Sequence, residues 1–231
     1  MATPPEPRKE RPNPRLGEAE FTARQLSLIL LLVAIGCAVA VPAVWASSQG
    51  PLAREMAIHI ALMSCAAPIS AAVVYVIVPT PPLRPAWLWV TTILQLVLLW
   101  SLHVPNVHHA TMASGPVRAL SLAALFLGAM GFWLCLLWRG SSSAPWQEIL
   151  ALLLTAKLAC LLAALLVFAP REIFADAHHS RGGMVDQQAA GLLMLIACPL
   201  TYFVPAIFLA ARLLSSAGSL ARAPTLLARP T

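Results

Sequence analysis

Residues 102–112 read LHVPNVHHATM, and this short stretch carries three of the chain's six histidines. The six are His59, His103, His108, His109, His178 and His179. Imidazole nitrogens are common metal ligands, and thioether sulfurs lie near them in the sequence. Met56, His59 and Met63 are spaced i, i+3, i+7, which places them on one face of a helix. Imidazole together with thioether favours copper, and the thioether favours Cu(I) in particular.

A further candidate ligand, Met194, lies in the last apolar segment. One helical stripe there contains four residues spaced by three or four positions: Gln187, Gly191, Met194 and Cys198. Gly191 would let a neighbouring helix approach closely. Carboxylates, which a hard cation would need, are few near these ligands: Glu55, Glu172, Asp176 and Asp186. All five cysteines fall inside apolar runs without a CxxC pair, so we expect neither a disulfide framework nor a Cys-rich zinc site.

The composition places these ligands in a membrane protein. Of the 231 residues, 59% are hydrophobic and 10% are charged, whereas a soluble domain carries about 25% charged residues. The net charge is +6, but the basic residues fall in loops and tails. There they indicate membrane topology rather than a nucleic-acid surface.

Six apolar runs are long enough, or nearly so, to cross a bilayer as helices, which takes about 20 residues. They are Gln25–Ala46, Met56–Val78, Ala86–His103, Val117–Trp138, Trp146–Ala169 and Ala189–Leu213. We therefore predict an all-α integral membrane bundle of six transmembrane helices over residues 25–215. A basic, Pro-rich, disordered cytoplasmic tail (1–24) precedes it, and a similar cytoplasmic tail (216–231) follows it.

The distribution of Lys and Arg orients this bundle. With the amino terminus in the cytoplasm, ten basic residues lie inside and four outside, so both termini are predicted to be cytoplasmic. The sequence AVWAS also fits a signal-peptidase site after Ala46, and cleavage there would leave the remaining orientation unchanged. In this orientation all six histidines fall at the outer face of the membrane.

Each candidate ligand has a simpler interpretation. The rings of His108, His109 and the pair His178–His179 can rest among lipid headgroups, and methionines such as Met56 often only fill space. His59 and His103 are less easily explained in this way, because polar groups at span ends inside a bundle are uncommon and tend to be functional.

Two further polar residues allow two interpretations each. Lys157 lies near the middle of the fifth span, where it is either functional or extends its amine toward the cytoplasmic headgroups. Asp186 precedes the last span, where it either caps free N–H groups of that helix or orients His59 or His103 from outside the ligand shell.

Three stretches, EMAIHIALMSCAAP (55–68), LHVP (102–105) and DQQAAGLLM (186–194), together resemble the CtaG family of multi-span bacterial assembly factors for cytochrome c oxidase. The family pattern has an HMxxHLLLM-type helix followed by APP, a W-H-x-P helix end, and a DQQ-x-x-G-x-x-M opening of the last span. The resemblance covers about residues 50–215, and the DQQ stretch is its most specific part.

The resemblance implies that each residue matching the family pattern has the same role here as in the family. The matching residues are His59, Met63, His103, Asp186, Gln187, Gln188, Gly191 and Met194. Two positions depart: Glu55 stands where the family has the first His of HMxxH, and VRALS (117–121) replaces a histidine-bearing HxxxH stretch. The metal site is then either reduced or rebuilt from His108, His109, His178 and His179.

The resemblance and the outer-face ligands together predict an assembly factor for cytochrome c oxidase that holds or delivers copper, as Cu(I), at the periplasmic face of the bacterial inner membrane. Its expected partners are oxidase subunits, periplasmic copper carriers and the lipid bilayer, without nucleic acid, and no enzymatic activity is expected. Two alternatives remain open. The first is a haem-binding electron carrier with His59 and His103 as axial ligands. The second is a copper transporter, although soft groups deeper in the membrane are few and scattered.

Overall fold

The computed structural model describes residues 44, 50–78, 83–139, 145–174 and 183–222, with side chains described as far as residue 215. Every regular element in these ranges is helical. In chain order they are α2 (Pro51–Ile60), the π-helical segment η1 (Ala61–Ala66), α3 (Ala67–Ile77), α4 (Pro85–Leu102), α5 (Pro105–Ala113), α6 (Gly115–Arg139), α7 (Trp146–Phe168) and α8 (Gly183–Arg222). The first three elements form one continuous helix.

Five helices in the described ranges are long and apolar enough to cross a membrane. They are Pro51–Ile77, Pro85–Leu102, Gly115–Arg139, Trp146–Phe168 and Gly183–Ser215. These correspond to the last five predicted spans, so the prediction of an all-helical, multi-pass membrane protein is confirmed for this part of the chain. The first predicted span, Gln25–Ala46, lies outside the described residues apart from Val44, and the six-span count and the cytoplasmic termini stay predictions.

Proline begins three of these helices, for a simple backbone reason. Pro51, Pro85 and Pro105 each stand at the first position of α2, α4 and α5, where the missing N–H costs nothing and the fixed φ suits a helix. Pro68 lies instead inside the continuous helix, directly after η1. Because proline has no N–H to bond the carbonyl four residues earlier, the regular α-helical ladder is interrupted at this place.

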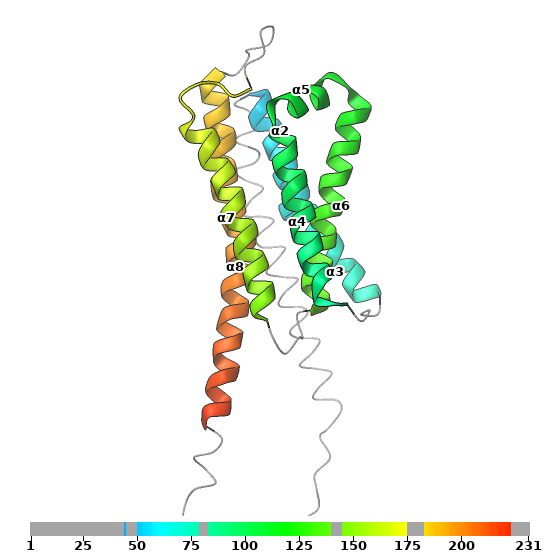
Figure 1. Cartoon of the computed structure of the whole chain (residues 1–231), viewed down its shortest axis with the longest axis vertical. Coiled ribbons are helices and arrows are strands. Elements are labelled where there is room, and N and C mark those ends of the chain that lie inside the picture. Colours follow the sequence, from blue (N-terminus) through cyan, green and yellow to red (C-terminus); the bar gives the residue numbers. More distant parts are fainter. Residues whose placement is uncertain (1–43, 45–49, 79–82, 140–144, 175–182, 223–231) are drawn as a thin grey trace, which may run out of the picture.

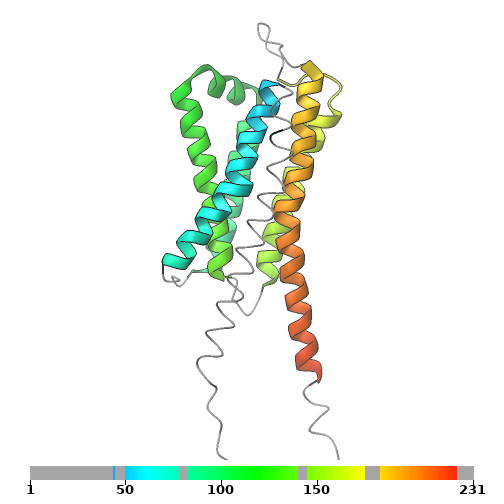
Figure 2. The same ribbon diagram turned by 180° about the vertical axis from the view of Figure 1, so that it is seen from behind.

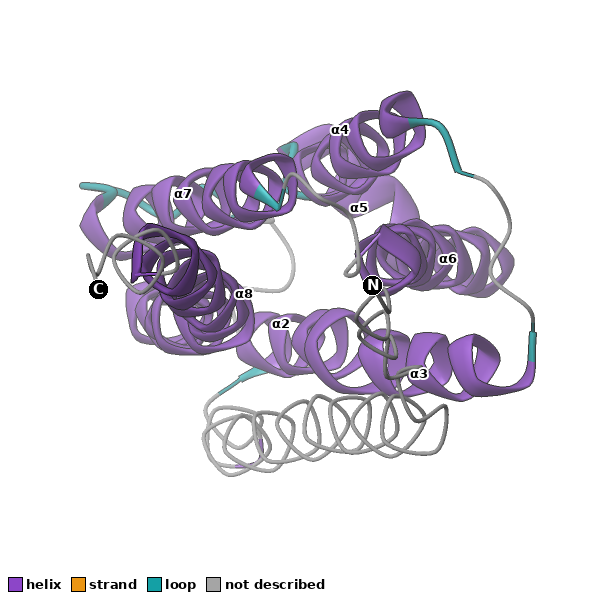
Figure 3. Cartoon of the chain, turned by 90° about the horizontal axis from the view of Figure 1, so that it is seen from below, coloured by secondary structure: helices purple, strands orange, loops and turns teal. Residues whose placement is uncertain are grey.

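The helices pack as a bundle in which α7 and α8 form an antiparallel pair (Figures 1 and 2). The long helix α2–η1–α3 crosses the bundle, so that α2 packs on α8 while α3 packs on α6. Seen from below in Figure 3, α4 lies between α7 and α6 and contacts both. This crossing brings the Met and His residues of α2 against the residues of α8.

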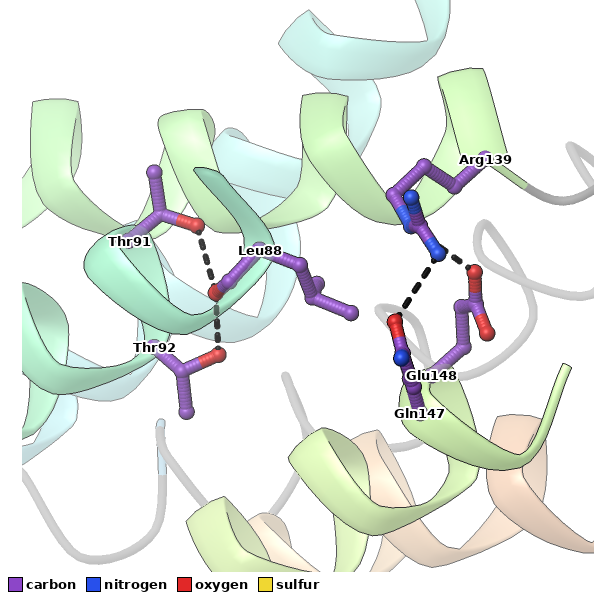
Figure 4. Close-up of polar contacts among 6 residues, drawn as sticks. All are labelled: Leu88, Thr91, Thr92, Arg139, Gln147 and Glu148. Atoms are coloured by element: carbon purple, nitrogen blue, oxygen red, sulfur yellow. Dashed lines mark hydrogen bonds and ion pairs between the residues drawn. The ribbon is translucent and has the colours of Figure 1, made fainter. Parts of the chain in front are cut away.

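The two ends of the bundle are formed by different elements and contacts. One end, at the top of Figure 1, holds the start of α2, the short helix α5, the end of α7 and the start of α8. At the other end, Arg139 ties α6 to the start of α7, with its Nε 3.0 Å from Glu148 Oε1 and its Nη2 3.0 Å from Gln147 Oε1 (Figure 4).

Figure 4 also shows Thr91 and Thr92 donating to the Leu88 carbonyl within α4, so their hydroxyls are satisfied inside the helix.

Two details differ from the sequence-based expectation. His108 and His109 fall between the predicted spans Ala86–His103 and Val117–Trp138, and the structure places them on an additional helix, α5, which connects α4 to α6. The last span was expected to end at Leu213, but α8 continues through Arg222 and contains Pro199 and Pro205. Residues 216–222 of the expected tail are therefore helical.

Candidate functional site

The rings of His59 and His103 lie side by side at the end of the bundle that holds α5. Their centroids are 5.8 Å apart and their planes meet at 66°. His59 comes from the last turn of α2, and His103 is the residue that ends α4. Both side chains are buried. Two histidines separated by 44 positions in the sequence thus converge, as the predicted helix arrangement requires.

The polar contacts of His103 fix which of its nitrogens carries a lone pair. Its Nδ1 lies 2.7 Å from the Leu99 carbonyl oxygen, which can only accept, so Nδ1–H is the donor. In a neutral ring this leaves Nε2 unprotonated. That atom lies 2.9 Å from Met56 Sδ, a weak acceptor with no proton of its own. Two soft lone-pair donors therefore face each other, an arrangement that a bound cation would satisfy.

A small cavity continues from this pair into the bundle, and we call it the thioether cavity. Its volume is about 20 Å³, which is room for one water-sized species. The side chains that line it are Met56, His59, Ile60, Met63, Ser64, Leu99, Thr155, Ala159, Met194, Cys198 and Tyr202. Three predicted methionine ligands, from α2, η1 and α8, thus share one void with His59, and all three are buried.

His59 also lines a second void of about 10 Å³, which we call the ion-pair cavity. Its lining is Glu55, His59, Leu102, His108, Thr111, Met112, Arg118, Ser121 and Leu122. His59 thus stands between the two cavities, and its Nδ1 is buried without a hydrogen-bond partner. A buried imidazole nitrogen is normally paired, so this atom is available to a ligand from either side.

His108 projects into the ion-pair cavity from α5. Burial lowers the pKa of His108, and neighbouring His109 lowers it further, whereas the carboxylate of Glu55 acts in the opposite direction. The ring therefore stays neutral at neutral pH and keeps one nitrogen lone pair. It also packs against Phe174, with the ring centroids 4.8 Å apart, which holds the segment that follows α7 against α5.

Glu55 and Arg118 form a two-point ion pair between α2 and α6. Arg118 Nε donates to Glu55 Oε2 at 3.3 Å, and its Nη2 donates to Glu55 Oε1. The Glu55 side chain is nearly buried, while that of Arg118 is 37% exposed. The carboxylate closest to His59 is therefore already neutralised by a cation of the protein.

Asp186 holds α2 in place from the first turn of α8. Its Oδ2 accepts from the backbone N–H of Leu52 at 2.9 Å, and its Oδ1 accepts from that of Ala53 at 2.8 Å. The expectation that Asp186 caps its own helix is corrected in this respect, because both oxygens cap α2. Gly50, which supplies no side-chain cap, is needed here because a Cβ at this position would overlap the Asp186 carboxylate.

The residues that follow Asp186 secure α8 to α7. Gln187 Oε1 accepts from the Ile173 N–H at 2.7 Å, and its Nε2 donates to the Leu166 carbonyl at 3.1 Å. Gly191 allows the close approach of the two helices, since a Cβ there would lie 2.7 Å from Val167 Cγ2 and 2.9 Å from the Ala163 carbonyl oxygen. Asp186, Gln187 and Gly191 thus position the ligand-bearing helices rather than entering either cavity.

Other predicted residues are not brought to the cavities. His109 is half-buried beside His108, with ring centroids 6.2 Å apart, and Gln188 is exposed. Lys157 is exposed on α7 and lines neither cavity. His178 and His179 lie outside the described residues. Within the described ranges, no group of three or more His, Cys, Asp or Glu side chains is placed to hold a metal ion.

Three features of the site were not found from the sequence. Arg118 was counted only as a topology signal, yet it pairs with Glu55 across helices. Tyr202 lines the thioether cavity with a buried hydroxyl that has no hydrogen-bond partner. The π-helical segment around Met63 is a feature frequent at functional sites. Pro68, which has no N–H for the helical ladder, is the residue in the sequence that indicates this π-helical segment.

The structure therefore defines a helical membrane protein with two histidines and three methionines gathered at one end of its bundle. The family model described as cytochrome c oxidase caa3 assembly factor (Caa3_CtaG) matches residues 12–216. The chain belongs to this family of cytochrome c oxidase assembly factors, and the resemblance inferred from three motifs is confirmed. No curated protein and no solved structure matches the chain significantly.

The two departures from the family pattern lie together in the structure. Glu55 stands in place of a family histidine, and Arg118 and Ser121 belong to the stretch that replaces HxxxH. All three residues line the ion-pair cavity. An ion pair therefore fills the place where the family pattern would add imidazoles beside His59. The thioether cavity keeps three residues that match the pattern, His59, Met63 and Met194.

Proposed function

We propose that the chain assists assembly of a caa3-type cytochrome c oxidase by holding Cu(I) at the His59–His103 end of the bundle and passing it to an oxidase subunit. The periplasmic face of the bacterial inner membrane is the proposed location. The observation that carries the proposal is the contact between His103 Nε2 and Met56 Sδ beside the unpaired Nδ1 of His59. Imidazole and thioether are the ligands that suit Cu(I).

The low number of ligands suits transfer rather than permanent storage. Two imidazoles and nearby thioethers can bind Cu(I) firmly enough that little free ion is released. The ligands of a partner's site can then replace them one at a time. Such an exchange involves no substrate turnover, so the proposed role is not enzymatic. Periplasmic copper carriers would supply the ion, and oxidase subunits would receive it.

The size of the cavity argues against the haem alternative. Two histidines on facing helices can ligate a haem axially, but the macrocycle needs a pocket of several hundred Å³. The void beside His59 measures about 20 Å³. Copper fits the available space, and a haem would require the helices to separate.

The test compares copper binding by the purified full chain with that of the double variant His59→Ala/His103→Ala. Cu(I) is titrated anaerobically in competition with a colorimetric chelator, and an absorption spectrum is recorded. We expect tight Cu(I) binding by the wild type and loss of most of it in the double variant. His109→Ala is the matched control, because it removes a nearby histidine that lines neither cavity.

A deletion strain tests the assembly role separately. We expect its oxidase to contain less copper and to regain it when the wild-type chain, but not the double variant, is restored. Absence of copper binding together with normal oxidase copper content would exclude the copper role. A Soret band in the purified wild type, lost in the double variant, would favour the haem alternative instead.

A further inference from the structure

We propose that Cys198 supplies the anionic ligand of a buried Cu(I) site in the thioether cavity, with Met194 as its neighbour on α8. The inference rests on the proposed function, since it assumes that copper enters this end of the bundle. It adds a ligand that the sequence motifs did not assign, and it places the ion deeper than the His59–His103 pair.

The first argument is charge. The eleven side chains that line the thioether cavity include no Asp or Glu. Cu(I) bound there by imidazole and thioether alone would leave an uncompensated positive charge inside the bundle, which is costly in a medium of low dielectric constant. Glu55, which lines the neighbouring ion-pair cavity, is paired with Arg118. Cys198 is the soft lining residue that can become an anion, and a thiolate suits Cu(I).

The second argument is the state of the polar atoms around the same void. His59 Nδ1 and the Tyr202 hydroxyl both belong to lining residues, and both are buried without a hydrogen-bond partner. Their side chains are 6% and 2% exposed. Buried polar groups are rarely left unpaired. Two such groups in one small void indicate a place that receives a ligand.

The third argument is position on the helix. Met194 and Cys198 are four residues apart on α8, so their side chains share one face one turn apart. Met63 faces them from η1, where the interrupted helix is held by a hydrogen bond from Trp133 Nε1 to the Met63 carbonyl at 3.3 Å. The thiol of Cys198, three thioethers and the imidazole of His59 thus line the void.

The binding step balances without a redox partner. The S–H bond of Cys198 breaks and an S–Cu bond forms, so one Cu⁺ replaces one H⁺ on the sulfur. The copper stays Cu(I), and the proton leaves to the water at the end of the bundle from which the ion came. The net charge of the occupied cavity is the same as that of the empty one.

The test measures how many protons are released when Cu(I) binds and whether sulfur atoms coordinate the bound copper. Cu(I), supplied anaerobically as its acetonitrile complex, is added to the purified full chain at pH 8, where imidazoles are neutral and release no proton on binding. We expect about one proton released per copper bound, and sulfur neighbours in the copper X-ray absorption spectrum. Cys198→Ser should release almost none and should bind Cu(I) at least about tenfold more weakly.

Cys135→Ser is the matched control, because Cys135 is equally buried on α6 but does not line the cavity. It should behave as the wild type does. Unchanged proton release and affinity in Cys198→Ser would overturn the inference while leaving copper binding through His59 and His103 intact. If Cys198→Ser fails to fold, wild-type protein that binds Cu(I) without releasing a proton overturns it just as clearly. Wild-type protein that binds no Cu(I) excludes both proposals.

Discussion

The carboxylate of Asp186 lies across the amino end of α2, where its Oδ1 accepts a hydrogen bond from the backbone N–H of Ala53 at 2.8 Å. Asp186, in the first turn of α8, thus fixes the helix that carries Met56 and His59. The backbone N–H of Leu52 donates a second hydrogen bond to Asp186 Oδ2, so both carboxylate oxygens cap α2. The relationship explains how a residue that touches neither cavity can control the ligand geometry.

Replacing this cap should loosen α2. Asp186→Ala leaves two buried N–H groups unpaired, and we expect the free energy of unfolding to fall by about 2 kcal/mol. Asp186→Asn keeps one acceptor oxygen and should lose less. Thermal unfolding in detergent measures the stability, and Cu(I) competition measures the effect on binding. Gln188→Ala, an exposed change two residues along, should alter neither; equal losses in both variants would refute the capping role.

Gly191 provides a second test of how the helices are positioned. Gly191→Ala places a methyl group within 2.7 Å of Val167 Cγ2 and 2.9 Å of the Ala163 carbonyl oxygen, so α7 and α8 must separate. We expect a loss of about 1–3 kcal/mol in stability. Gly131→Ala is the matched change, because its added Cβ meets only Thr91 Cγ2 at an ordinary 3.5 Å. Comparable unfolding temperatures for the two variants would argue against close α7–α8 packing.

Met56 offers a direct test of the thioether contact. Met56→Leu conserves volume in the core, so the fold should change little, but it removes the sulfur that lies 2.9 Å from His103 Nε2. We expect Cu(I) affinity to fall at least about tenfold, the lower end of what losing a supporting contact costs at metal sites. Met130→Leu, a partly buried methionine outside the thioether cavity, should bind as the wild type does. Retained affinity in Met56→Leu would remove Met56 from the ligand set.

The ion-pair cavity allows a gain-of-function prediction. Glu55→His/Ser121→His adds two imidazoles beside His59 and His108 and breaks the pair with Arg118, whose partly exposed side chain can turn to solvent. We expect this variant to bind one more metal ion per chain than the wild type. Glu55→Gln/Ser121→Ala is the control without added ligands. Identical copper stoichiometry in all three proteins would show that the cavity cannot be rebuilt as a site.

The sequence by itself determined the membrane class, the family and, to within two residues, the bounds of α4, α6 and α7. Apolar runs of span length predict helices because a buried backbone must satisfy its own hydrogen bonds in lipid. The spacing of Met56, His59 and Met63 also placed them on one face. These features are local in the chain, so periodicity and composition are enough to predict them.

Only the tertiary structure decided which distant residues meet. That Glu55 pairs with Arg118, that Asp186 caps α2, and that Cys198 and Tyr202 share a void with His59 depends on how the helices cross. The crossing is set by close approaches such as that at Gly191 and by the interruption at η1. Helix periodicity says which face a residue occupies, but it carries no information about which partner helix that face will contact.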